Sequence, residues 1–351
     1  MTTKNDASTV KIIDGKSKNR NLNPVIITIF SILMIYTIAM LILIGWGLLT
    51  SFKTSMDFIT NGNVLGFPSY SAEIHKAKYY EGWTLWNYLT NNYSVVFNIF
   101  KFRTNGVSYI SAIWGKIVKV GVDVQFYHFV INSIVYAVLG SVIQVFTCMT
   151  TAFMCCKYKY KFSYFIYTML LIVMTIPIIG SGPSTIQLLY DLGIFDTYFA
   201  MIIMSANMSG MYFFVYFAFY QGLSDTYIEA AEIDGSSQLM TYIRIVIPLS
   251  MKMAGTVVLI TFITLWNNYS VPLMYYPTKP TLAYAIYMMN SNTLHIENQF
   301  FNQNTPQRIA GCMVLAVPMM ILFVLLKNRI LHKLYMAVIE PCCYLFSFLQ
   351  M

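Results

Sequence analysis

The chain alternates between six long apolar stretches and shorter polar segments. Each stretch has about the 20 residues that an α-helix needs to cross a lipid bilayer. Only a helix satisfies its own backbone hydrogen bonds in lipid, so we predict six transmembrane α-helices. The stretches are Val25–Phe52, a second within Val124–Cys156, a third that begins at Phe162 and fades near Gly180–Ser184, Thr197–Gly222, about Met253–Pro272 with a start as early as Ile247, and Ile309–Leu326.

Positive charge in the short loops predicts the orientation of these helices. Lys and Arg gather in the N-terminal tail, in the "KYKYK" loop and after the sixth stretch, whereas 179–196 has none and 275–306 has only Lys279. Cytoplasmic loops carry this excess, so both termini are expected in the cytoplasm. The predicted parts are a cytoplasmic tail (1–23), the first helix (24–52), an external segment (53–123), a core with the other five helices (124–330) and a cytoplasmic loop at 224–247, and a cytoplasmic C-terminal tail (331–351).

The external segment, 53–123, is unusually long for a connection between two membrane helices. It carries several lysines, but long loops cross the membrane largely regardless of charge. Its many aromatic residues and mixed polarity ("YYEGWTLWNYLTNNYSVVFNIF") favour a small folded cap over a loose linker. The sequence does not indicate the fold of that cap.

Composition agrees with an integral membrane protein. The chain is 57% hydrophobic and only 10% charged, with a mean hydropathy of +0.60. The net charge of +8 belongs to the loops, so we expect a lipid bilayer and no nucleic acid as its partner. The first apolar stretch is too long for a cleaved signal peptide and is expected to remain as an anchor.

The residue types argue against an enzyme or a metalloprotein. The six cysteines form no CxxC pair, and the four histidines are scattered without an HExxH motif. The sequence also lacks a GxxxxGK[ST] phosphate-binding loop. We therefore predict no catalytic residue, no metal site and no cofactor bound by this chain.

The cytoplasmic loop is acidic, with Asp225, Glu229, Glu232 and Asp234 close together. A short helix is predicted over Thr226–Ile233, capped by Ser224 and Asp225 and ended by Gly235, which adopts positive φ at low cost. A second helix is predicted over Ser236–Val246. Its apolar face would carry Tyr242, Ile245 and Val246, before Pro248 marks the start of the fifth membrane helix. Two helices that merely cap the bundle at the membrane surface are the simpler alternative.

The loop resembles the coupling-loop signature of binding-protein-dependent ABC importer permeases. The matching pattern is Glu229-Ala230-Ala231, three residues, Gly235, nine residues, Ile245, one residue, an aliphatic residue and Pro248. Ile247 and Ser224 depart mildly from the family, which usually has Leu and often Pro there. Further stretches resemble the carbohydrate-uptake, maltose-type branch: "WTLWNY", "FVINSIVYA", "LGIFDTYFAMII", "LWNNYSVPLMY" and "PTLAYAIY". The C-terminal "LYMAVIEPCCYLFSFLQM" departs from the family pattern.

This resemblance implies an all-α integral membrane protein with the type I ABC importer permease architecture and an enlarged external loop between its first two helices. It implies import of a carbohydrate such as an oligosaccharide across a bacterial cytoplasmic membrane, by alternating access. The implied partners are a second, related permease that completes a heterodimer, an ABC ATPase dimer that binds ATP and Mg, and an extracellular or periplasmic solute-binding protein.

For the loop residues, the resemblance implies that Glu229 makes the charged contact with the ATPase. Ala230 and Ala231 would allow a close fit, and Gly235, next to Asp234, would set the angle between the two helices. Ile245 and Pro248 would tie the loop to the fifth membrane helix.

The solute pathway is less clear from the residues. Trp266, Asn267, Asn268 and Tyr269 are our candidates, because sugars stack on aromatic rings and hydrogen-bond to amides. An interfacial aromatic belt with amide bonds between helices explains the same residues equally well. An importer of a non-sugar solute is an open alternative. A self-contained secondary transporter is a weaker one, since the predicted spans contain no Asp, Glu or Arg for ion coupling.

Overall fold

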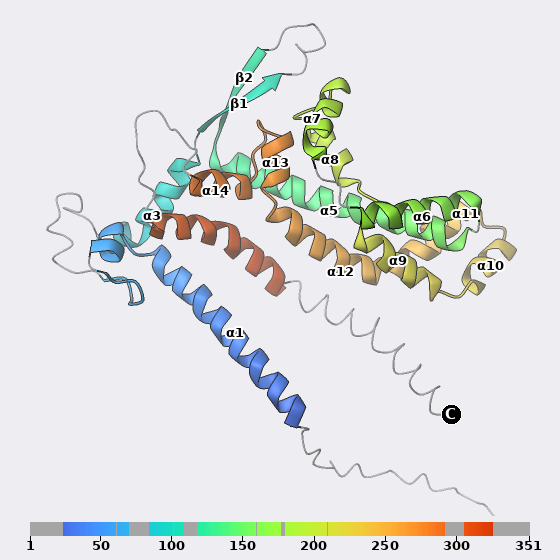
Figure 1. Cartoon of the computed structure of the whole chain (residues 1–351), viewed down its shortest axis with the longest axis horizontal. Coiled ribbons are helices and arrows are strands. Elements are labelled where there is room, and N and C mark those ends of the chain that lie inside the picture. The colour runs from blue at the N-terminus through green and yellow to red at the C-terminus, as the bar shows by residue number, and fades with distance from the viewer. Residues whose placement is uncertain are drawn as a thin grey trace, which may run out of the picture. The chain divides into compact units, whose positions relative to one another are not determined.

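A computed structural model describes residues 24–60, 62–69, 84–100, 102–108, 118–158, 160–176, 180–208, 210–291 and 305–325 (Figure 1). The predicted tails, 1–23 and 331–351, lie outside these ranges. The chain divides into two units, Met1–Gly47 and Leu48–Met351. In the first unit the described residues belong to one helix, α1 (Pro24–Ser51), which begins at the predicted proline. Its apolar side chains are exposed from Val25 to Leu43, as expected of a helix that faces lipid.

The second unit is mostly helical. The part that corresponds to the predicted external segment contains the π-helix η1 (Met56–Thr60), helix α3 (Leu85–Ile99) and an antiparallel pair of strands, β1 (Phe102–Ser108) and β2 (Val118–Val124). The helices that follow are α5 (Phe126–Lys157), α6 (Lys161–Thr175), α7 (Ser181–Asp191), α8 (Tyr198–Ser205), α9 (Met211–Gln221), α10 (Thr226–Ile233), α11 (Gln238–Thr241), the π-helix η2 (Tyr242–Val246), α12 (Ile247–Trp266), α13 (Ser270–Tyr275), α14 (Leu282–Asn290) and a final helix, Thr305–Leu325.

Among the described residues, three helices are long and apolar enough to cross a membrane: α1, α5 and Thr305–Leu325. A fourth span results if Gln238–Met251 and Met253–Trp266, which are bent by 68°, count as one. Helix α6 has the predicted position but only 15 residues. The six predicted spans are therefore found only in part, and the predicted orientation remains a prediction.

Two predicted spans are not the continuous helices that we expected. The stretch Thr197–Gly222 forms α8 and α9 with a break between them that contains Asn207 and Gly210. The fifth span ends at Trp266, and α13 begins anew at Ser270. Asn and Gly are poor helix formers, and Asn267 and Asn268 end the fifth span in the same way. Both breaks lie within stretches of apolar composition, so composition alone did not reveal them.

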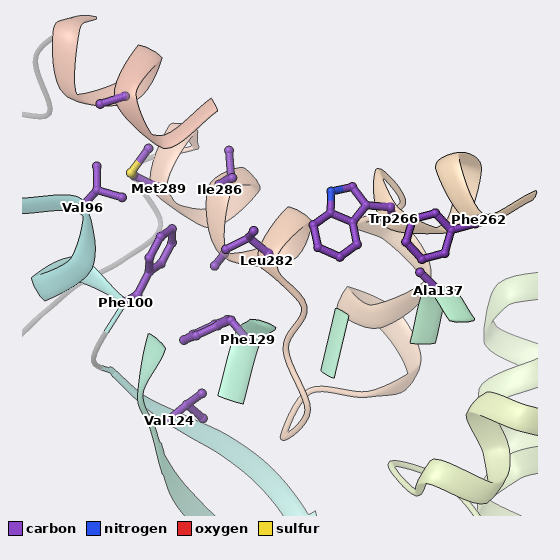
Figure 2. Close-up of a cluster of buried hydrophobic side chains, with 12 residues drawn as sticks. Val96, Phe100, Val124, Phe129, Ala137, Phe262, Trp266, Leu282, Ile286 and Met289 are labelled. Carbon is purple, nitrogen blue, oxygen red and sulfur yellow. The ribbon is translucent and has the colours of Figure 1, made fainter. Parts of the chain in front are cut away.

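Helix α5 is the centre of the second unit and packs against α12, α9 and α8. Gly140 makes this packing possible, because a Cβ there would lie 2.8 Å from Leu265 Cδ1 and 3.0 Å from Ser205 Oγ. Figure 2 shows a core cluster in which the external helix α3 joins α5, α12 and α14. In it, the rings of Phe100 and Phe129 lie 5.5 Å apart. The external segment is thus packed on the core, which agrees with the predicted folded cap.

A second anchor of the external segment is the buried carboxylate of Asp57. It accepts hydrogen bonds from Ser69 N (3.0 Å), Ser69 Oγ (2.6 Å), Asn63 Nδ2 (3.1 Å) and Tyr88 Oη (3.1 Å). Burial alone would raise the pKa of Asp57, but these hydrogen bonds outweigh it and hold that pKa below its ordinary value. Lys53, also buried, donates to the carbonyls of Asn63 (2.8 Å) and Val64 (3.0 Å). The network holds the turn at 62–69 against α3.

Candidate functional site

The predicted first helix of the cytoplasmic loop is confirmed, since α10 covers Thr226–Ile233. Gly235 follows with a φ of +77°, in the left-handed region that glycine adopts at low cost. Gly235 N donates to Glu232 O (3.0 Å), and Ser236 N donates to Ala231 O (2.9 Å). This pair of bonds is the Schellman arrangement that closes a helix at glycine. The sequence therefore predicted both the helix and its end.

The side chains of the motif divide between the surface and the interior. Glu229, Ala230 and Asp234 are exposed, as a contact with a partner requires. Ala231 is only 6% exposed, so its side chain faces the chain's own interior and not a partner. Of the two alanines that we predicted to allow a close fit with a partner, only Ala230 is therefore exposed.

Asp225 differs from its predicted role as a helix cap. Its side chain makes no cap hydrogen bond and instead lies 2.6 Å from Lys157 Nζ at the end of α5. Lys157 Nζ also donates to Leu223 O at 2.6 Å. The lysine side chain is 9% exposed and the aspartate side chain 68%, so the lysine of this pair is largely buried and the aspartate is in contact with solvent. Lys157 lies in the "KYKYK" loop. We used the charge of this loop to predict the orientation of the membrane helices, but the sequence did not indicate the contact with Asp225.

A hollow of about 540 Å³ lies beside this pair, between α10 and the end of α5. The acidic residues Asp225, Glu229 and Glu232 line it, together with Tyr158 and Lys157. Burial and then the nearby Glu232 carboxylate raise the pKa of the Tyr158 phenol. The hollow therefore offers an acidic edge to a basic partner group.

The second helix of the loop differs from the prediction. It begins at Gln238, where Ser237 Oγ accepts from Met240 N (3.4 Å), and not at Ser236. It does not end at Val246, because α11 continues through η2 directly into α12. Pro248 is the second residue of α12, directly after the π-helix η2, and it is exposed. The second helix of the loop therefore runs on into α12, which bends by 68° between Met251 and Met253.

Tyr242 and Val246 attach this element to the core. Tyr242 stacks on Phe153 of α5 with ring centroids 5.0 Å apart, and its hydroxyl lies 2.7 Å from Thr150 Oγ1. Val246 is buried and Ile245 is half-buried, which confirms the predicted apolar face. A displacement of α11 would thus be transmitted to α5 and α12 through packed side chains.

The four candidates for the solute pathway have different surroundings. Trp266 is 7% exposed and its Nε1 donates to Leu315 O (3.2 Å), so it packs within the core cluster of Figure 2. Asn267 Nδ2 donates to Ile263 O (2.9 Å) at the end of α12. Tyr269 stacks on Tyr287 at 4.3 Å. Asn268 lines a cavity of about 170 Å³ next to α13.

Comparisons with known proteins bear on the core of the chain. The family model described as "Binding-protein-dependent transport system inner membrane component" matches residues 144–336, more than half of the chain. The sn-glycerol-3-phosphate transport system permease protein UgpE of Salmonella typhimurium is 29% identical over 165 residues, which cover 47% of this chain and 58% of that protein. UgpE of Escherichia coli (strain K12) is 28% identical over 149 residues, which cover 42% of this chain and 53% of that protein.

The chain thus spans about half the length of the curated relatives it matches. Among solved structures, a bacterial ABC transporter involved in the import of the acidic polysaccharide alginate aligns with 74% of this chain and 99% of its own, with 18% identity and a TM-score of 0.48.

Proposed function

This chain belongs to the binding-protein-dependent transport system inner membrane component family, and we propose that it is the permease subunit of an ABC importer for a carbohydrate. The observation that carries this proposal is the cytoplasmic loop. It combines a glycine-ended helix, which exposes Glu229 and Ala230, with a second helix that continues into α12. Family membership alone makes it a transport permease; the importer's solute and partners are our proposal.

We propose that the loop transmits closure of an ABC ATPase to the membrane helices. The exposed acidic edge, with Glu229 at its centre, would bind a basic groove on the ATPase, and Ala230 would let the surfaces approach closely. Because α11, η2 and α12 are continuous, a pull on α10 reaches the core through Tyr242 and its stack on Phe153. ATP and Mg would be bound by the ATPase dimer, so this chain would hydrolyse nothing.

The remaining assembly is proposed on the same basis. A second, related permease would complete the pathway, and a solute-binding protein would deliver the solute from outside a bacterial cytoplasmic membrane. The folded external segment, with α3 and the β1–β2 pair, is our candidate for part of the binding protein's dock.

A carbohydrate is favoured because the relatives are named for transport of sn-glycerol-3-phosphate, a hydroxylated solute. The second candidate is an importer of the same type for a non-sugar solute. The coupling loop fits either one, so the solute must be identified by experiment.

The test is ATP hydrolysis and solute uptake by the complex, reconstituted with its ATPase, partner permease and binding protein. A panel of oligosaccharides, glycerol 3-phosphate and amino acids would identify the solute. We expect one hydroxylated solute to stimulate ATP hydrolysis and Glu229→Lys to abolish the stimulation. Asp191→Lys is the matched control, because Asp191 is an exposed acid on α7, outside the loop. Normal uptake by Glu229→Lys would refute the proposed role of the loop, and stimulation by an amino acid would refute the carbohydrate.

A further inference from the structure

A small polar cavity of about 170 Å³ lies where α5 meets two interruptions in the helical bundle. Its volume equals that of roughly five or six water molecules at about 30 Å³ each. Three of its lining residues, Met204, Leu265 and Val271, are apolar. The other six are Tyr136, Gln144, Ser205, Asn207, Asn268 and Tyr276.

The cavity has a defined floor on α5. Tyr136 and Gln144 line it from one face of that helix, and Gly140 lies between them on the same face. Gly140 brings Ser205 and Leu265 to within 3.0 Å of the position of a Cβ. Alanine at this position would force the side chains of Leu265 and Ser205, which line the cavity, to move.

Both breaks in the predicted spans contribute to this one cavity. Asn207 lies between α8 and α9, and Asn268 lies between α12 and α13. Irregular backbone at membrane depth is tolerated where it is buried in protein or lines a water-filled cavity. Broken helices that meet at such a place form the binding sites of many transporters. The coincidence of the two breaks therefore indicates a site and not two separate defects.

Several polar groups of the cavity have hydrogen-bonding capacity left. Asn268 Oδ1 accepts from Ser270 Oγ (3.0 Å) and Val271 N (3.2 Å), which fixes the carboxamide, while its Nδ2 has no acceptor among the described residues. The Gln144 carboxamide likewise has no partner within the described part of the chain. The hydroxyl of Tyr136, a residue only 4% exposed, is also without one there. Tyr276 Oη is 3.2 Å from Met204 Sδ, a weak acceptor.

Gln144 and Asn268 are half-buried, so their unused donors and acceptors are open to a ligand or to water that enters the cavity. Here the donors and acceptors are carboxamides and phenols, which pair well with hydroxyl groups. None of the nine lining residues carries a charge. A phosphate or carboxylate would therefore enter without a counter-charge, at a considerable desolvation penalty.

We propose that this cavity is a binding subsite for the neutral, hydroxyl-bearing part of the transported solute, held by Gln144 and Asn268 with Tyr136 at its base. The inference rests on the proposed transport function and adds to it a location and a chemical preference. Of the four residues "WNNY" predicted for the solute pathway, it keeps only Asn268. It adds residues of α5 that lie more than a hundred positions away in the sequence. Glucose and glycerol are expected to bind, and glycerol 3-phosphate to bind more weakly than glycerol.

The experiment measures weak binding directly on the full chain in lipid nanodiscs, by saturation-transfer difference NMR, with empty nanodiscs subtracted. The probes are glucose, glycerol and glycerol 3-phosphate. The variants are Gln144→Leu and Asn268→Ser, because serine keeps an oxygen that can cap α13 but lacks the carboxamide donor. The matched control is Asn267→Ser, whose amide bonds Ile263 O outside the cavity.

We expect saturable glucose binding in the wild type and in Asn267→Ser. Each cavity variant should weaken it roughly two- to tenfold, the effect of one neutral hydrogen bond. Should Gln144→Leu fail to insert, Asn268→Ser decides alone. Unchanged binding in Asn268→Ser, no saturable signal in the wild type, or tighter binding of glycerol 3-phosphate than of glycerol would each overturn the proposal.

The measurement needs neither ATPase nor binding protein, so it fails independently of the proposed function. Glucose binding that depends on Asn268, in a chain that supports no ATP-driven uptake, would keep the subsite and reject the importer. ATP-driven uptake, together with glucose binding that is the same in Asn268→Ser as in the wild type, would support the importer and reject the subsite.

Discussion

The turn between α10 and α11 depends on one backbone angle, and substitutions at Gly235 test whether transport depends on it. The φ of Gly235 is +77°, and a Cβ built there meets nothing within 4 Å. A substitution therefore costs backbone strain alone, about 1–2 kcal/mol for alanine. Alanine also restricts the unfolded chain, which offsets about 0.4–1 kcal/mol of that strain. The net cost is about 1 kcal/mol, which lowers the ratio of turned to other loop conformations roughly fivefold.

A graded series at Gly235 makes this prediction sharp. Asparagine tolerates the left-handed region, whereas β-branched valine is a strained outlier there. We expect the solute transported per ATP hydrolysed, measured in proteoliposomes with the partner subunits, to fall in the order Gly, Asn, Ala, Val. The amount of inserted protein should not change, because the position is exposed. A valine variant with wild-type coupling, or an asparagine variant as impaired as valine, would refute the reasoning.

Two further predictions concern the anchors of the loop and of the external segment. Lys157→Met removes the contact with Asp225 and the bond to Leu223 O, but leaves Asp225 in water, so we expect a cost of about 1 kcal/mol. Amide hydrogen exchange across 223–234 should accelerate roughly fivefold, and unchanged exchange would contradict the anchor. The pKa of Asp57 is depressed in the folded state, so its stabilisation is present above the unfolded pKa of about 3.9 and is lost as the pH falls through the folded pKa. Protection of the amides at 62–69, measured relative to the intrinsic exchange rate at the same pH, should therefore fall below about pH 4 in the wild type, whereas in Asp57→Asn it should be low at every pH.

The cytoplasmic loop was predictable because its signals are local. The extent of α10 follows from its flanking residues, and its end follows from Gly235, which takes the expected positive φ. The apolar spacing of Tyr242 and Val246 likewise predicted a buried face. The pairing of Asp225 with Lys157 was not predictable, since 68 positions separate the two residues and only the tertiary fold brings them together.

The helix breaks were missed for a different reason. Hydropathy averages over about 19 residues, and in such a window Asn207 or Asn268 is outweighed by apolar neighbours. We predicted Trp266 to Tyr269 together as candidates for the solute pathway, because of their aromatic rings and amides. The structure assigns them to different contacts: Trp266 to the core, Asn267 to its own helix, Tyr269 to Tyr287 and Asn268 to a cavity. Side-chain direction at a helix end cannot be derived from composition.

The short motifs that pointed to the carbohydrate branch have a structural explanation of their own. Asn132 Nδ2 donates to Pro280 O (3.1 Å), its Oδ1 accepts from Tyr198 Oη (2.8 Å), and Ser133 Oγ accepts from Leu282 N (2.7 Å). Asp196, from a third motif, accepts from Thr278 Oγ1 at 2.6 Å. Three stretches that are far apart in the sequence therefore form one hydrogen-bonded cluster.

Each of these polar groups is retained because a buried polar atom without its partner is costly, whatever the solute. Asn132, Ser133 and Asp196 lie in that cluster and not among the residues that line the 170 Å³ cavity. The motifs accordingly support the fold and say little about the solute. Solute preference is better sought in residues such as Gln144 and Asn268, whose amides have hydrogen-bonding capacity that the fold does not use.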